Sequence, residues 1–289
     1  MKNVFVILLY FSCLSCFNQE KIVDKSKLLG NDIRLFQETP AWNLAKAVND
    51  EDTAAIKREV EINMVSIDYK DERFGHTLLS MAIRNDKYES TKTLLTLGAN
   101  PNAADKYMGT TPIIYAAKKD DPKYLKLLLS YNGNPNSAED APPIEGNTPR
   151  NTVLSSAIGY MDNSSLEKVK LLVAAGADVN SDNKGRTSKP LNDAFMAGKM
   201  DVALYLMEHG ADYRSLMYTM VDGEEVYILK ALRKATFDLN SEEYKQKLKV
   251  IAFLKAKGLD YDDEPIPDYI LNEIKEKYPY NWKDYLGKY

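Results

Sequence analysis

Cysteine and histidine are scarce in this chain of 289 residues. The only cysteines are Cys13 and Cys16, and the only histidines are His76 and His209. No disulfide can therefore form beyond residue 16, and neither histidine has a further histidine or cysteine to join it as a zinc ligand. A glycine-rich phosphate loop, Gly-x-Ser-x-Gly and His-Glu-x-x-His are also absent. We therefore expect no catalytic, cofactor-binding or metal-binding residues and no enzyme activity.

An excess of positive charge is missing as well. The chain has 38 lysines and arginines against 42 aspartates and glutamates, which gives a formal net charge of −4. A domain that binds nucleic acid usually carries a basic patch or stripe, and neither half of this sequence is strongly basic. We therefore expect no nucleic-acid partner.

The apolar run near the start of the sequence is short. Lys2 precedes residues 4–11, VFVILLYF, which are too few for a permanent transmembrane helix but typical of an export signal. The serine directly before Cys16 resembles the end of a bacterial lipoprotein signal, so residues 1–16 are interpreted as a signal peptide with a lipobox-like cysteine. We expect a lipid on Cys16. Cys13 is the alternative acceptor, and a plain cleaved signal is the alternative interpretation.

The polar stretch that follows, residues 17–38, shows little periodicity and is expected to be a flexible tether. A repeating pattern then occupies most of the chain. Residues 75–102, GHTLLSMAIRNDKYESTKTLLTLGANPN, predict a turn, a short helix capped by Thr77, a second helix and a stop at Gly98. Similar helix stops follow at spacings of 34, 44 and 34 residues, at Asn132, Gly176 and Gly210. Asparagine is the usual substitute for glycine in this left-handed position.

Units of two helices and a turn with a period of about 33 residues are the pattern of ankyrin repeats. The chain resembles the ankyrin-repeat family over roughly residues 41–261, and its closest matches are Thr111-Pro112 and the stretch GADVN at 176–180. The resemblance implies an all-α fold in residues 39–261, an ankyrin-repeat solenoid of about six helix-turn-helix units. Its terminal units are degenerate, and short hairpin fingers connect the units.

Two segments depart from the repeats. Residues 137–151 form an insertion of about ten residues relative to the period, and insertions of this kind become loops on one face. Whether this loop contacts a partner is left open. Residues 262–289 begin with a proline-rich break and include an aromatic stretch. We expect a C-terminal helical cap there, because the open end of a solenoid needs covering; a partner-binding patch is the alternative.

The resemblance also indicates where a partner would bind. Ankyrin arrays are similar to one another in binding proteins on the concave face formed by fingers and inner helices. Tyrosine is enriched among interface hot spots, and this chain has 19 tyrosines. The expected partner-binding residues are Lys106, Tyr107, Met108, Tyr115, Lys118, Asn183, Lys184 and Arg186.

Fold and signal together predict a non-enzymatic, protein-binding lipoprotein of the bacterial envelope. We expect a monomer held to the membrane through its N-terminal lipid alone and facing the periplasm; a soluble periplasmic or secreted protein is the alternative. The resemblance to exported ankyrin proteins suggests an immunity protein that neutralises a toxin delivered by a neighbouring cell. The alternative function is a scaffold or stabiliser of a periplasmic enzyme or envelope complex.

Overall fold

The computed structural model describes residues 21–142, 150–159, 163–182 and 188–289. Within these ranges the first half of the chain contains η1 (Lys25–Lys27), η2 (Ile33–Phe36), α1 (Trp42–Asn49), α2 (Thr53–Lys57), the π-helical turn η3 (Arg58–Ile62), α3 (Leu78–Arg84), α4 (Tyr88–Thr96), α5 (Pro112–Ala117) and α6 (Lys123–Ser130). The second half contains α7 (Val153–Ala157), α8 (Ser165–Ala174), α9 (Pro190–Met196), α10 (Met200–Glu208), β1 (Tyr218–Thr219), β2 (Glu225–Val226), α11 (Ile228–Lys234), α12 (Glu242–Ala256), η4 (Tyr261–Asp263), α13 (Asp268–Lys277) and α14 (Trp282–Leu286).

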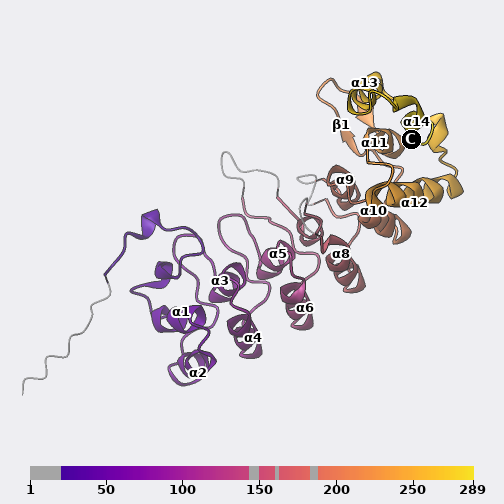
Figure 1. Cartoon of the computed structure of the whole chain (residues 1–289). Helices are drawn as coiled ribbons and strands as arrows, with labels where there is room; N and C mark the ends of the chain where they lie inside the picture. Colours follow the sequence, from indigo (N-terminus) through magenta and orange to yellow (C-terminus); the bar gives the residue numbers. More distant parts are fainter. Residues whose placement is uncertain (1–20, 143–149, 160–162, 183–187) are drawn as a thin grey trace, which may run out of the picture.

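The helices stack as successive pairs along one axis (Figure 1). The first helices of the pairs, α1, α3, α5, α7 and α9, pack one against the next and form an inner row. Their partners α2, α4, α6, α8 and α10 form an outer row. The apolar sides of both rows meet in one continuous core, in which Leu79, Ile113 and Val202 are fully buried. The predicted all-α repeat solenoid is confirmed.

The helix-end signals predicted at Thr77 and Asn132 are present in the structure. The hydroxyl oxygen of Thr77 accepts the backbone N–H of Ser80 at 3.3 Å and so caps α3. Pro112 occupies the first turn of α5, where its missing N–H costs nothing. Asn132 ends its repeat with φ = 62°, the left-handed conformation that glycine adopts at the other stops.

The segment that precedes the repeats is anchored in its described part. Residues 21–38 contain η1 and η2, and the latter buries Leu35 and Phe36 against α1. The guanidinium of Arg73 donates a hydrogen bond of 2.6 Å to the carbonyl of Leu28. From residue 21 on, the stretch interpreted as a flexible tether therefore lies against the first repeats. We call residues 21–38 the N-terminal strap.

The insertion at residues 137–151 begins and ends as a paired stem. The N–H of Glu139 donates to the carbonyl of Asn151 at 3.0 Å, and Ala138 forms a bridge with Thr152. Residues 143–149, between the two arms, lie outside the described residues. The predicted protruding loop is therefore described only at its base, where it adjoins the start of α7.

Helices α11 and α12 follow the short β1–β2 hairpin, α12 packs against α10, and a second, smaller hydrophobic cluster forms in the C-terminal segment. Ile270 and Ile274 of α13 pack with Tyr285 of α14. The Tyr285 hydroxyl donates a 2.7 Å hydrogen bond to the carbonyl of Phe237, between α11 and α12. Aromatic rings of the C-terminal segment thus lie against the end of the solenoid. Across the described ranges, no helix combines the length and apolar character needed to cross a bilayer.

Candidate functional site

The inner row of helices presents side chains at fixed positions in each repeat. In the repeats of α3, α5, α7 and α9, residues four and seven places after the cap are three apart, a spacing that puts two residues on one side of a helix; in the repeat of α7 the second of them, Gly159, follows the end of the helix. The caps are Thr77, Thr111, Thr152 and Lys189. We call the side of the solenoid defined by these positions the inner face, which comprises Met81, Arg84, Tyr115, Lys118, Ser156, Gly159, Asp193 and Met196; of these, Met81 is fully buried.

The described residues include five of the eight predicted partner-binding residues. Tyr115 and Lys118 belong to the inner face, and Lys106, Tyr107 and Met108 lie in the connector between α4 and α5. The other three, Asn183, Lys184 and Arg186, lie outside the described residues.

The three connector residues differ in the contacts they make within the chain and in their exposure. The Lys106 ammonium contacts the backbone carbonyl of Glu72, and the Met108 carbonyl accepts a 2.8 Å hydrogen bond from Arg150. The Tyr107 side chain is 49% exposed although its ring packs edge-on against Phe74. Tyr107 therefore offers exposed aromatic surface to a partner.

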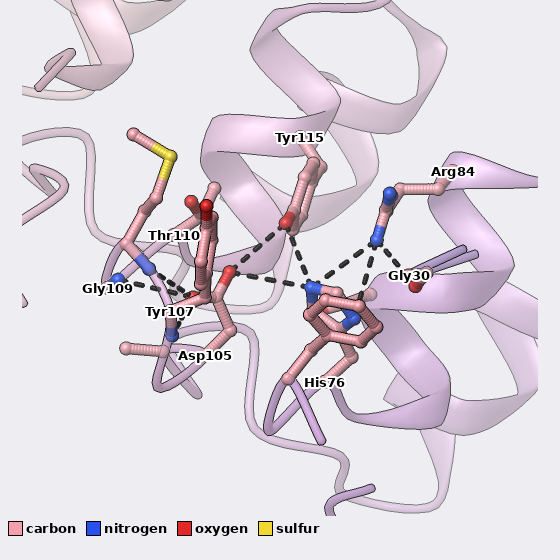
Figure 2. Close-up of polar contacts among 12 residues, drawn as sticks. Gly30, His76, Arg84, Asp105, Tyr107, Gly109, Thr110 and Tyr115 are labelled. Carbon is pink, nitrogen blue, oxygen red and sulfur yellow. Dashed lines mark hydrogen bonds and ion pairs between the residues drawn. The ribbon is translucent and has the colours of Figure 1, made fainter. Parts of the chain in front are cut away.

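Tyr115 belongs to a polar cluster that joins the strap to two repeats (Figure 2). Its hydroxyl donates to the Asp105 carboxylate at 3.1 Å and lies 3.2 Å from Nε2 of His76. Arg84 lies across the histidine ring, with Nη1 3.3 Å from Nε2, and donates a 2.6 Å hydrogen bond to the carbonyl of Gly30. The cluster thus links the strap to both α3 and α5.

The electrostatics of this cluster favour an uncharged histidine. Burial and the neighbouring Arg84 lower the pKa of His76, although the carboxylates of Asp105 and Asp71 act in the opposite direction. Burial and the Asp105 carboxylate raise the pKa of Tyr115, which keeps its hydroxyl protonated as a donor. His76 is only 4% exposed and lies under Gly30. The cluster therefore fastens the strap and offers no accessible acid or base.

Acidic residues at a constant spacing hold the connectors that lead into the inner helices. The Asp71 carboxylate accepts the N–H of Phe74 at 2.8 Å, and the Asp105 carboxylate accepts the N–H of Met108 at 2.9 Å. Glu139 occupies the position 34 residues after Asp105, and its carboxylate accepts the N–H of Asn151 at 3.1 Å. Each acid satisfies turn amides that no helix or strand pairs.

Glu139 also fixes Lys118. The Glu139 side chain is 1% exposed and pairs with the Lys118 ammonium at 2.8 Å. The same carboxylate oxygen accepts a 3.2 Å hydrogen bond from the Thr110 hydroxyl. Lys118 therefore reaches the inner face with its charge already compensated by a buried partner.

The inner face is hollowed between α5, α7 and α9. A pocket of about 230 Å³ opens there, and Lys118, Ser156, Gly159 and Asp193 are among the residues that line it. Asp193 is half-buried, and this burial raises the pKa of its carboxyl group, with the hydroxyls of Ser155 and Ser188 acting in the opposite direction.

Sequence reasoning did not single out Arg84, Glu139 or Asp193, and it assigned His76 only to a turn. The 34-residue spacing from Asp71 to Asp105 and on to Glu139 was the available signal for the connector acids. Asp193 carried no such signal, because it sits at the same repeat position as Met81, Tyr115 and Ser156, which share no chemistry with it.

Comparison with known proteins agrees with this geometry. A family model described as ankyrin repeats, in three copies, matches residues 44–140. Among solved structures, the ankyrin repeat domain of Bcl-3, described as a unique member of the IkappaB protein family, is similar with 24% identity and a TM-score of 0.52. That match covers 75% of this chain and 86% of the Bcl-3 chain. No curated protein has a sequence that matches.

Together these findings show the ankyrin-repeat fold. Ankyrin repeats indicate a protein–protein interaction module, and a scaffold of this fold is typically non-enzymatic. The comparisons indicate no catalytic family. In the described residues, no group of three or more histidine, cysteine, aspartate or glutamate side chains is arranged to hold a metal ion.

Proposed function

We propose that this chain is a lipid-anchored protein of the bacterial envelope that binds a protein partner on its inner face. The observation that carries the proposal is the state of that face. The face is built on packed helices. Between α5 and α9 it has a pocket whose Asp193 carboxylate is not paired with any cation among the described residues. A rigid, preformed surface binds with little ordering cost.

The proposal of a lipid anchor rests on the sequence alone. The short apolar run and the serine before Cys16 support lipid attachment at that cysteine, and a diacylated cysteine would hold the chain stably at a membrane. The Cys16→Ser variant should move from the membrane to the soluble fraction, whereas the matched Cys13→Ser variant should stay membrane-bound. The reverse pattern would transfer the anchor to Cys13, and two membrane-bound variants would refute lipid anchoring at a single cysteine.

Capture of a partner tests the binding function. The chain from residue 17 on would be used to capture proteins from envelope extracts, followed by mass spectrometry. The variant Tyr107→Ala/Met196→Ala, which removes one exposed connector side chain and one exposed inner-face side chain, should lose the captured protein. The control variant Lys92→Ala/Glu208→Ala changes exposed side chains on α4 and α10 of the outer row and should still capture the protein. A partner lost equally from both variants, or from neither, would contradict binding on the inner face.

In its concrete form, the proposal makes the partner a toxin delivered by a neighbouring cell, with this chain as the immunity protein. Cells that lack the chain should then be killed by sister cells that produce the toxin, and cells that express it should survive. Equal survival would remove the immunity role. Capture of a resident envelope enzyme in the same extracts would instead support a scaffold or stabiliser.

A further inference from the structure

The pocket in the inner face arises because one repeat contributes small residues. Four places after the cap, α3, α5 and α9 carry Met81, Tyr115 and Asp193, but α7 carries Ser156. Seven places after the cap the other repeats carry large side chains, whereas the repeat of α7 has Gly159. These two small residues leave the hollow of about 230 Å³ between Lys118 and Asp193.

The polar groups of this pocket are not all satisfied. The Lys118 ammonium is paired with buried Glu139 at 2.8 Å. Asp193 forms no ion pair within the described ranges, and no nearby cation acts on its pKa there. The hydroxyl of Ser156, a residue only 9% exposed, is buried without a hydrogen-bond partner among the described residues. A buried polar group without a partner is unfavourable. The Asp193 carboxylate can only accept hydrogen bonds when ionised and the Ser156 hydroxyl can also accept, so the pocket favours a ligand that donates hydrogen bonds.

The size of the hollow limits what that ligand can be. Pockets for cofactors and drug-sized molecules usually enclose roughly 300–1,000 Å³, which is more than the 230 Å³ found here. The hollow is nevertheless several times the ~30 Å³ that one water molecule occupies in the liquid. It is therefore suited to a single protruding side chain.

We propose that the pocket is an anchor site for an arginine side chain of the protein partner, with Asp193 as its charge acceptor and Ser156 as a second acceptor. The guanidinium group carries five N–H donors in a planar fork that matches a carboxylate, and it is more weakly hydrated than an ammonium group. A half-buried carboxylate that pairs with no cation among the described residues, beside a hydroxyl that has no hydrogen-bond partner there, is complementary to it. This inference rests on the proposed protein-binding function and specifies the chemistry of the partner.

The test titrates the chain from residue 17 on with N-acetylarginine amide and monitors the backbone amide signals of Ser156, Gly159 and Asp193 by NMR. N-acetylcitrulline amide, which has nearly the same shape without the charge, is the matched probe. We expect saturable shifts with the arginine probe and at least about tenfold weaker binding of the citrulline probe. The Asp193→Asn variant should weaken arginine binding by at least about tenfold, whereas Glu208→Gln, the same charge change on the exposed outer face, should leave it unchanged.

Three results would overturn the proposal: no saturable shift with arginine, equal binding of citrulline, or unchanged arginine binding by Asp193→Asn. If that variant fails to fold, the comparison of the two probes on the unaltered chain still decides. If a partner is captured from envelope extracts but the arginine probe does not bind, the anchor site is refuted and the proposed protein-binding function stands.

Discussion

The contact between the strap and the inner face can be tested by adding a single methyl group at Gly30. A methyl group added at Gly30 would lie 2.8 Å from Cε1 of His76 and 3.2 Å from Nη1 of Arg84. His76 has little room to retreat, because its ring stacks on Phe74 with 5.4 Å between centroids and its Nε2 lies 3.2 Å from the Tyr115 hydroxyl. We therefore expect Gly30→Ala to lift this part of the strap away from the repeats.

The magnitude follows from the cost of overpacking. An extra methyl in a well-packed site typically costs about 1–3 kcal/mol, and each 1.4 kcal/mol is a factor of about ten in an equilibrium constant. Local opening of residues 25–34 should therefore become roughly 5- to 150-fold more frequent, while the helices of the repeats keep their protection. Hydrogen exchange measured by mass spectrometry on peptides from both regions reports the two effects separately.

A neighbouring substitution serves as the control for this experiment. Leu29 is 75% exposed, so Leu29→Ala should leave the exchange of the strap within about twofold of the unaltered chain. Adding His76→Ala to Gly30→Ala should reduce the effect of the added methyl, because the atom it meets is gone. Unchanged exchange in Gly30→Ala would refute the close approach of the strap to His76.

Three further predictions concern buried charges. Burial and neighbouring Arg233 lower the pKa of Lys247 to about 7. Above pH 7 the unfolded chain therefore binds more protons than the folded chain, and the free energy of unfolding should rise by about 2 kcal/mol from pH 7 to 9. Lys247→Met should abolish this rise in urea unfolding, and an unchanged rise in the variant would contradict the prediction. Because burial raises the pKa of Asp193, Asp193→Asn should raise the melting temperature of the free protein at pH 7.5 and not at pH 3, since the cost of the buried charge disappears below the unfolded pKa. A lower melting temperature of the variant at pH 7.5 would contradict this prediction. Glu139→Ala leaves the Thr110 hydroxyl without its acceptor and should cost about 2–3 kcal/mol in chemical denaturation, against less than about 0.5 kcal/mol for the exposed control Glu208→Ala; equal costs would show that the pairing of Glu139 contributes nothing.

The sequence predicted those parts of the fold that local chemistry determines. Thr77 was expected to cap its helix and Asn132 to replace glycine in the left-handed position, and both do so. Such features depend on a few neighbouring residues and a repeat period, which are legible in a single sequence. The array of helix pairs follows from them once the period is recognised.

The candidate site depended on contacts that the repeat pattern does not encode. Gly30 and Arg84 are 54 residues apart, and His76 and Tyr115 are 39 apart. Their meeting required the strap to fold back over α3, which its polar composition did not indicate. The pocket beside Asp193 could not be predicted for a related reason, since it is formed by the small residues Ser156 and Gly159 and not by a recognisable motif.

Binding of a protein on the inner face is the central claim, and site-specific photocrosslinking in cells that make the protein tests it most directly. A benzophenone amino acid would replace Met196, which is 56% exposed on the inner face, or Lys92, which is exposed on the outer helix α4. We expect a discrete crosslinked protein with the probe at position 196 and none with the probe at position 92. A crosslink from position 92 alone, or no crosslink from position 196, would contradict the account.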